Sequence, residues 1–171
     1  MSMTVNLNYV KNEQKTFSKH LEDVKGIKYQ ESKFVVGESQ ILHLQSELFE
    51  VLNETKIHKG YDKEVNRERV LEELSDCLSI IGNISKDIDV DLEIETEVIQ
   101  VESVIKQFRR IVYDVSRLDK PAKVGLARKK LREIIVPEFL NLVYSLGFNL
   151  EELKNAYFKK MQQNYKNPKF N

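Results

Sequence analysis

The chain has 171 residues, of which 41% are hydrophobic and 32% charged, a composition typical of one globular domain over residues 1–171. Its formal net charge of zero gives no general attraction to nucleic acid. The single cysteine, Cys77, cannot form a disulfide within the chain, and no apolar stretch approaches the ~20 residues of a membrane span. The N-terminus lacks the apolar core of a signal peptide, so we expect a soluble, cytoplasmic protein.

The pattern of apolar residues is helical along most of the chain. Only six glycines and three prolines interrupt it, and alternating strand patterns are short. We therefore predict an all-α fold, a bundle of about five to six helices around an antiparallel helix hairpin. The first helix covers about 11–24 and ends at Gly26, because glycine readily adopts the left-handed conformation of a helix end.

The second and third helices form the predicted hairpin. Ser39 can cap a helix over about 39–57 and Asp62 one over about 62–86, since short polar side chains accept hydrogen bonds from the first free backbone amides. Gly60 breaks the chain between them. The next segment, 85–97, alternates like a strand, but its many acidic residues favour a turn or an extended linker. A fourth helix is expected over about 95–117.

Caps also define the last helices. Asp119 is the predicted cap of a fifth helix with Pro121 in its first turn, and Pro137 is expected to kink or break that helix because proline lacks an amide hydrogen. Gly147 ends this part of the chain, and Asn149, with a glutamate three residues later, begins the last helix with a capping box. The six residues that follow the last helix are expected to be frayed.

Two pairs of acidic residues interrupt the apolar faces of the hairpin helices. Glu47 and Glu50 lie on the second helix, and Glu73 and Asp76 lie on the third. In an antiparallel hairpin, residues whose numbers have the same sum lie at the same height, and Glu47 with Asp76 gives the same sum as Glu50 with Glu73. We therefore expect all four carboxylates to meet at one level, at the edge of the core.

Carboxylates packed together repel one another, and an ionised carboxylate without a partner is costly to bury. A divalent cation removes this conflict, and hard oxygen ligands suit Mg²⁺ or Mn²⁺. The alternative is a solvated helix face, which is the usual role of acids three residues apart in a highly charged chain. The shared height and the apolar flanks favour the metal site.

The same residues carry a resemblance to a known superfamily. ELFE (47–50), followed after 22 residues by ELSD (73–76), resembles the paired acidic motif of the all-α nucleotide pyrophosphohydrolases, which include MazG-like enzymes and dimeric dUTPases. RVLEELSDCLSIIGNI (69–84) resembles the metal-binding helix of that superfamily, including Asn83. AYFKKMQQNYKN (156–167) is similar to the segment of dimeric dUTPases in which a lysine and an asparagine contact the phosphates, and Lys160 and Asn164 occupy those positions.

This resemblance implies a reaction, a substrate and an assembly. It implies Mg²⁺-dependent hydrolysis of a deoxynucleoside triphosphate, with dUTP as the preferred substrate and dUMP and pyrophosphate as products. MazG-like breadth or a preference for dCTP is the alternative, because Ser18 stands where dimeric dUTPases usually carry a uracil-reading glutamine. Glu50, or else Glu47, would accept the proton of the attacking water, while Asn83, Lys160 and Asn164 would bind the substrate. The family also implies a homodimer.

A hypothesis of another class is a non-catalytic helical module that binds nucleic acid or a protein partner. Residues 1–102 hold 21 acidic and 12 basic residues, whereas residues 103–171 hold 6 acidic and 15 basic ones. Five of the basic residues lie in the run KVGLARKKLREII: Lys123, Arg128, Lys129, Lys130 and Arg132. A solvated helix face explains this run better than a nucleic-acid interface. The three histidines lack the spacing of zinc ligands, and we assign them to the surface or to packing.

Overall fold

A computed structural model describes residues 2–27, 36–60, 64–97, 103–119 and 124–171. Within these ranges the chain is largely helical, as predicted, and it carries one small two-stranded sheet. The elements are β1 (Ser2–Asn6), α1 (Asn8–Lys25), α2 (Glu38–Thr55), α3 (Arg67–Asp87), β2 (Glu93–Glu97), α4 (Val104–Ser116), α5 (Val124–Lys130), the π-helical η1 (Leu131–Ile135), α6 (Val136–Ser145), α7 (Leu150–Lys166) and the short 3₁₀ helix η2 (Pro168–Phe170).

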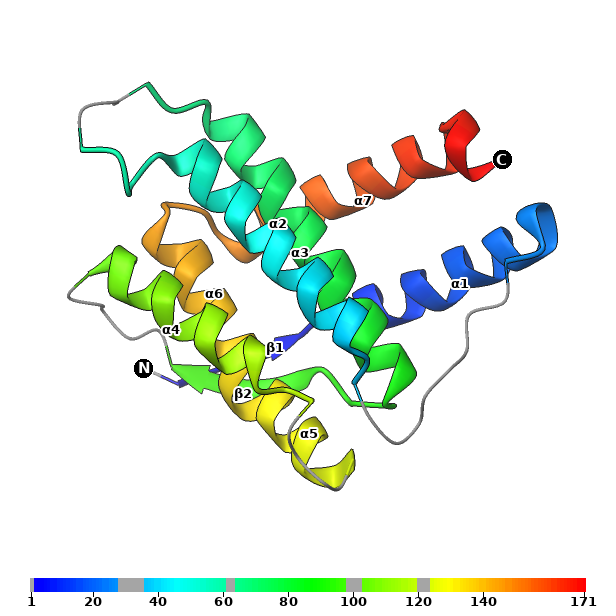
Figure 1. Cartoon of the computed structure of the whole chain (residues 1–171), viewed down its shortest axis with the longest axis horizontal. Helices are drawn as coiled ribbons and strands as arrows, with labels where there is room; N and C mark the ends of the chain where they lie inside the picture. Colours follow the sequence, from blue (N-terminus) through cyan, green and yellow to red (C-terminus); the bar gives the residue numbers. More distant parts are fainter. Residues whose placement is uncertain (1, 28–35, 61–63, 98–102, 120–123) are drawn as a thin grey trace.

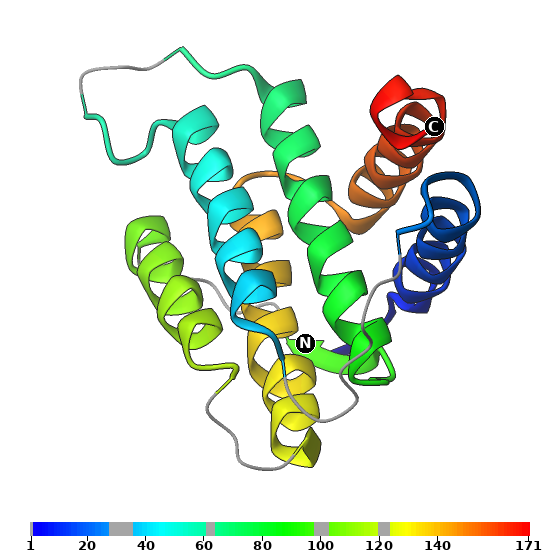
Figure 2. The ribbon, with the colours of Figure 1, turned by 45° about the vertical axis from the view of Figure 1, so that its right-hand side comes forward.

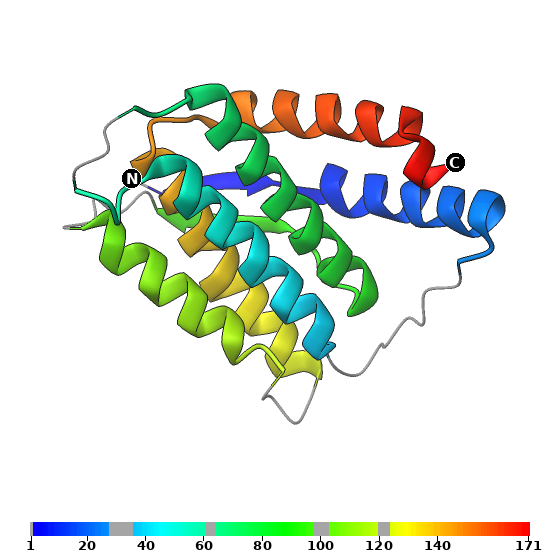
Figure 3. The same ribbon diagram turned by 45° about the horizontal axis from the view of Figure 1, so that its top comes forward.

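Helix α3 lies at the centre of the bundle. It packs against α2 to form the predicted antiparallel hairpin, and also against α1 and α7 (Figure 1). Helices α4 and α6 lie on the other side of the hairpin from α1 and α7 (Figure 2). Helices α1 and α7 run side by side in the same direction (Figure 3), and Tyr157 of α7 is fully buried against α1. The candidate site therefore lies where α2, α3 and α7 approach one another.

Close packing of α1 on α3 depends on Gly82. A side-chain carbon added at this position would clash with the Val10 side chain and would lie 3.2 Å from the Val10 backbone oxygen. Val10 is itself fully buried. The contact fixes the distance between the two helices, because no larger residue fits there.

The helix starts of the hairpin differ from the prediction. Gly37, and not Ser39, is the cap of α2, where the Gln40 side chain accepts a hydrogen bond from the Gly37 amide at 3.2 Å. The cap of α3 is Asn66, whose side chain accepts from the Arg69 amide at 3.3 Å. Asp62, the predicted cap, lies outside the described residues.

Strand β2 corrects a second prediction. Residues 93–97 were expected to be a turn or linker and 95–97 the start of a helix, yet they pair antiparallel with β1, and α4 begins only at Val104. Ile94 and Thr96 are buried while their neighbours are exposed, so the alternation of apolar and acidic residues did mark a strand. The acidic residues occupy the solvent face, where their charge costs little. Strand β1 was missed because it is short.

A kink or break was predicted at Pro137; the helix is not broken there, and its irregularity takes the form of a π-helical segment just before the proline. Helix α5 passes into η1 and then into α6, with Pro137 in the first turn of α6. The wider turn of a π-helix accommodates a residue that lacks an amide hydrogen and crowds the preceding turn. Asp119 lies in a turn ahead of α5, and Pro121 lies outside the described residues.

Three predicted helix ends are confirmed and one is wrong. Gly26 and Gly147 adopt positive φ angles of 65° and 86° at the ends of their helices, and Asn149 forms the predicted capping box of α7. The C-terminal residues, however, are ordered as η2, and the Phe170 ring lies 5.4 Å from the Phe17 ring of α1. None of the described helices combines the length and apolar character needed to cross a membrane.

Candidate functional site

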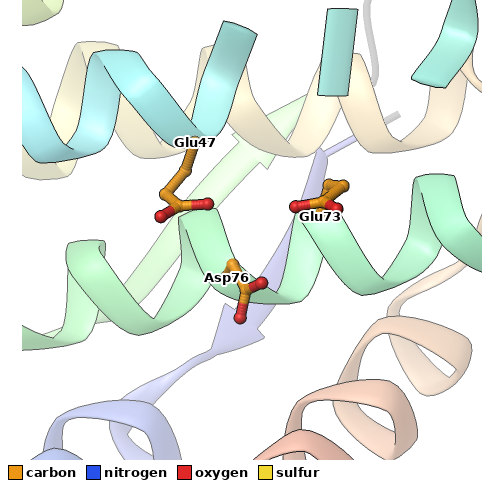
Figure 4. Close-up of side chains that lie close together, drawn as sticks. All are labelled: Glu47, Glu73 and Asp76. Carbon is orange, nitrogen blue, oxygen red and sulfur yellow. The ribbon is translucent and has the colours of Figure 1, made fainter. Parts of the chain in front are cut away.

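Three of the four predicted carboxylates come together between α2 and α3. Oxygen atoms of Glu47, Glu73 and Asp76 lie within 4.8 Å of one another, and the three side chains lie close together on α2 and α3 (Figure 4). All three residues are half-buried. Glu50, one turn along α2, is exposed and lies outside this group, although its charge affects Glu47 and Glu73. The antiparallel register thus places the acids as expected, except that Glu50 points towards solvent.

The carboxylates of the cluster repel one another when they are ionised. Burial and the neighbouring Asp76 and Glu47 carboxylates together raise the pKa of Glu73 to about 7, against the opposing charge of Lys160. Burial likewise raises the pKa of Glu47 and of Asp76, and Asp76 adds to the effect on Glu47. A positive charge at this point is therefore favoured.

Two basic side chains already contact the cluster. The Lys160 ammonium, from α7, lies 3.0 Å from an oxygen of Asp76 and the His43 Nε2 atom lies 3.3 Å from Glu47. Burial lowers the pKa of Lys160, but its hydrogen bond to Asp76 and the surrounding carboxylates outweigh burial and raise it overall. The His43 side chain is 59% exposed, which agrees with its predicted surface position, and its place one turn before Glu47 is the sequence signal for this contact.

A cavity of about 640 Å³ opens beside the cluster and extends along α3. Glu47 and Asp76 line it at one end, together with Lys160. Its other lining residues come from α1, α2, α3, α7 and the C-terminal residues: Gln14, Phe17, Ser18, Leu21, Ser39, Gln40, His43, Ser79, Ile80, Asn83, Lys86, Asp87, Met161, Asn164, Asn167, Lys169 and Phe170. The cavity thus joins an acidic end to a mixed polar and apolar interior.

All three residues predicted to bind substrate line this cavity: Asn83, Lys160 and Asn164. Asn83 lies two turns beyond Asp76 on α3, and Asn164 lies one turn beyond Lys160 on α7. The structure therefore brings residues from distant parts of the chain to one place. Sequence reasoning missed Gln14, whose side chain donates to the Tyr157 hydroxyl at 2.9 Å, one turn before Ser18.

Two residues of the predicted basic patch on α5 and η1 take part in internal contacts. Arg128 donates to the backbone oxygen of Ile88 at 2.6 Å, and Arg132 donates to that of Glu93 at 2.7 Å. Lys129 lies 4.0 Å from Glu133. Lys123 lies outside the described residues. These contacts tie the helix to the segment that follows α3, which supports a structural role for the patch.

The central hairpin of the bundle places clustered carboxylates beside a cavity that Lys160 also lines, a combination that suits a cation and a phosphate-bearing ligand. The sequence profile of a family described as dUTPase matches residues 6–169, nearly the whole chain. The chain therefore belongs to this dUTPase family, and membership supports a nucleotide hydrolase function. Searches of curated proteins and of solved structures gave no significant match.

Proposed function

We propose that the protein is an Mg²⁺-dependent nucleoside triphosphate pyrophosphohydrolase that converts dUTP to dUMP and pyrophosphate. The observation that carries the proposal is a cluster of Glu47, Glu73 and Asp76 beside a cavity. Glu47 and Asp76 line one end of that cavity together with Lys160. Clustered acids suit a cation, and a cation beside a lysine suits a triphosphate. The family match over residues 6–169 supports the same chemistry.

The residues of the cluster fit a hard divalent cation. Their donor atoms are all carboxylate oxygens, which Mg²⁺ and Mn²⁺ prefer. Burial raises the pKa of Glu73 and Asp76 even though Lys160 lies nearby, so a bound cation would stabilise the ionised carboxylates. Glu47, Glu73 and Asp76 would hold the cation, and Glu50 could join them by rotating its side chain. When bound, such a cation neutralises phosphate oxygens and makes a nearby water more acidic.

The remaining roles follow from position. Glu50 is our candidate for the residue that accepts the proton of the attacking water, because it lies beside the cluster and outside the group of donor atoms. Glu47 is the alternative. Lys160 and Asn164 would hold the phosphates, and Asn83, deeper in the cavity, would contact the nucleoside. In this scheme water attacks the α-phosphorus. The bond between the α-phosphorus and the oxygen that bridges it to the β-phosphorus then breaks, and pyrophosphate leaves.

We also propose that the protein is a homodimer. An apolar groove of about 360 Å³ lies between α2 and α4, and Phe49 and Tyr113 on its rim are 47% and 59% exposed. Exposed aromatic residues around a groove are typical of an interface between subunits. Helix α4, which lines the groove together with α2, lies on the side of the hairpin away from α1 and α7 (Figure 2).

The test is pyrophosphate release from a panel of dUTP, dCTP, dTTP, dATP and dGTP and the ribonucleotides, with and without Mg²⁺. We expect release that requires the metal and is fastest with dUTP. Comparable turnover of dATP and dGTP would indicate the broad specificity of a MazG-like enzyme. Turnover fastest with dCTP would show that dCTP, the alternative substrate, is preferred. If no nucleotide is hydrolysed with Mg²⁺ or Mn²⁺, the proposed reaction is wrong.

A further inference from the structure

The cavity has a second polar end, far from the acidic cluster. Asp76 and Lys86 both line it and are ten residues apart on α3, a rise of about 15 Å at 1.5 Å per residue. A nucleotide whose phosphates lie beside Asp76 and Lys160 would direct its base along α3, past Asn83, towards Lys86 and Asp87. The side chains at this end therefore face whatever part of the substrate lies farthest from the phosphates.

Three helices supply this end of the cavity. The Lys86 ammonium, on α3, donates to the Ser18 hydroxyl of α1 at 2.7 Å and lies 3.4 Å from Oδ1 of Asp87. The Gln40 side-chain amide, from α2, donates to Oδ2 of Asp87. The Lys86 side chain is 6% exposed and that of Asp87 15% exposed, so both charges sit in a largely enclosed place. An enclosed hydrogen-bond network of this kind holds its side chains in one arrangement.

The hydrogen-bonding character of each member is fixed by chemistry. Lysine can only donate, and an ionised carboxylate can only accept. Gln40 is oriented from both sides, because its oxygen accepts from the Gly37 amide and its nitrogen donates to Asp87. Lys86, Asp87 and Gln40 therefore offer a donor, an acceptor and a donor.

The Asp87 carboxylate keeps capacity for a ligand. A carboxylate has about four lone-pair positions, and Gln40 uses one of them. Oδ1 has no hydrogen-bond partner among the residues that the structure describes, although Lys86 lies nearby. Apolar side chains line the same cavity, with Phe17 and Leu21 from α1 and Ile80 from α3. Apolar walls with a few fixed polar groups suit a base.

We propose that Gln40, Lys86 and Asp87 read the base of the substrate and select a pyrimidine with a ring N–H between two carbonyl oxygens. This inference rests on the proposed function, since it places a nucleotide in the cavity. The ring N–H would donate to Asp87, and the two carbonyl oxygens would accept from Lys86 and Gln40. Uracil and thymine carry this edge. The three residues do not read the 5-methyl group that distinguishes thymine.

The same arrangement rejects the other bases by their polar edges. Cytosine has an unprotonated ring nitrogen, so its lone pair would face the Asp87 carboxylate, and its amino group would face a donor. Adenine presents a similar mismatch, and guanine replaces one carbonyl oxygen with an amino group. Buried polar groups left without partners make such mismatches costly, which is how a site built for hydrogen bonding discriminates.

The first test measures binding of nucleoside monophosphates to the wild-type chain by calorimetry, with Mg²⁺ present. We expect dUMP to bind at least about tenfold more tightly than dCMP, as one lost charge-assisted hydrogen bond would predict. N3-methyl-dUMP, which lacks the ring N–H, should lose a similar factor. Equal affinities of dUMP and dCMP, or no measurable binding of either, would overturn the inference.

The second test replaces Asp87 by Asn and compares it with Asp23→Asn, a matched change at an exposed aspartate of α1. A folded Asp87→Asn chain should lose most of the preference for dUMP over dCMP, while Asp23→Asn should retain it. An undiminished preference in Asp87→Asn would overturn the inference. If this variant does not fold, the comparison of dUMP with N3-methyl-dUMP on the wild type decides.

Hydrolysis of dUTP, measured in parallel, separates the two proposals. Pyrophosphate release without any preference between dUTP and dCTP would preserve the proposed reaction and overturn the base-reading role of Asp87. Selective binding of dUMP without pyrophosphate release would preserve the base-reading role and contradict the reaction.

Discussion

At Glu73, burial and the neighbouring acids raise the pKa to about 7, so folding makes this carboxyl harder to ionise. A group whose folded pKa lies above its unfolded value binds more protons in the folded state, and stability is lost as pH rises between the two values. In metal-free buffer the melting temperature should therefore fall as pH rises from about 4.5 to 7. Added Mg²⁺ should restore it at pH 8, by binding the folded state.

Replacing Glu73 by Gln tests the origin of that dependence. The neutral amide cannot ionise, so the metal-free variant should lose less stability between pH 5 and 8 than the wild type. Without this carboxylate the Mg²⁺-dependent rise in melting temperature should shrink, and nucleotide hydrolysis should be abolished. Glu22→Gln, at an exposed position of α1, is the matched control and should behave as wild type. An active Glu73→Gln enzyme would remove Glu73 from the site.

Lys160, a proposed phosphate ligand, contacts the acidic cluster through Asp76. We expect Lys160→Ala to weaken binding of a non-hydrolysable dUTP analogue by roughly tenfold or more, since a charge-assisted contact to phosphate is lost. The rise in melting temperature with Mg²⁺ should remain, because the carboxylate oxygens are unchanged. Lys154→Ala, on the exposed side of the same helix, should leave the affinity unaltered. Equal affinity in Lys160→Ala and wild type would exclude this lysine as a phosphate ligand.

The close contact between helices α1 and α3 depends on the absence of a side chain at Gly82. Gly82→Ala adds a methyl group against Val10, and overpacking of this kind costs about 1–3 kcal/mol, against less than about 1 kcal/mol gained in helix propensity. The melting temperature should fall by a few degrees. Gly125→Ala is the matched control, since nothing lies within 4 Å of the added carbon in α5. It should not lower the melting temperature.

The helices were predictable where the sequence carries both an apolar stripe and a local stop. Gly26, Gly147 and Asn149 act through their own backbone or side chain, so their effect is visible in sequence. Strand β2 was misassigned because its stability comes from pairing with β1, about ninety residues earlier in the chain. The order of the C-terminal residues likewise comes from the contact of Phe170 with Phe17, which only the packed structure reveals.

The candidate site was predictable to a similar degree. The hairpin register alone brings Glu47 to Glu73 and Asp76, because two consecutive antiparallel helices leave little freedom. The rotation of α2 about its axis decides that Glu50 faces solvent, and the register does not fix that rotation. Lys86, Asp87 and Gln40 carried no signal in the sequence, since each has an ordinary surface role when considered alone. Their meeting depends on how α1 and α2 pack on α3.

For the whole molecule, the unequal charge of the two halves has a structural consequence. The acidic half supplies α2 and α3, and the basic half supplies α7, which packs on α3 and brings Lys160 to Asp76. Lys159 adds a further contact to Glu68 at 3.4 Å. Both contacts lie along the edge where α7 packs on α3. Higher salt weakens exposed ion pairs such as Lys159–Glu68 more than enclosed ones.

The groove between α2 and α4 is the proposed interface of the dimer. The wild-type chain should sediment with the mass of two chains. Tyr113→Glu places a charge at an exposed aromatic residue of the groove. If the partner buries this residue, its loss should raise the dimer dissociation constant by roughly 30-fold or more. Val24→Glu, at a residue of α1 that is 49% exposed, is the control and should remain dimeric. A wild-type chain that sediments as a monomer, or a Tyr113→Glu variant as dimeric as the wild type, would show that this face is not the interface.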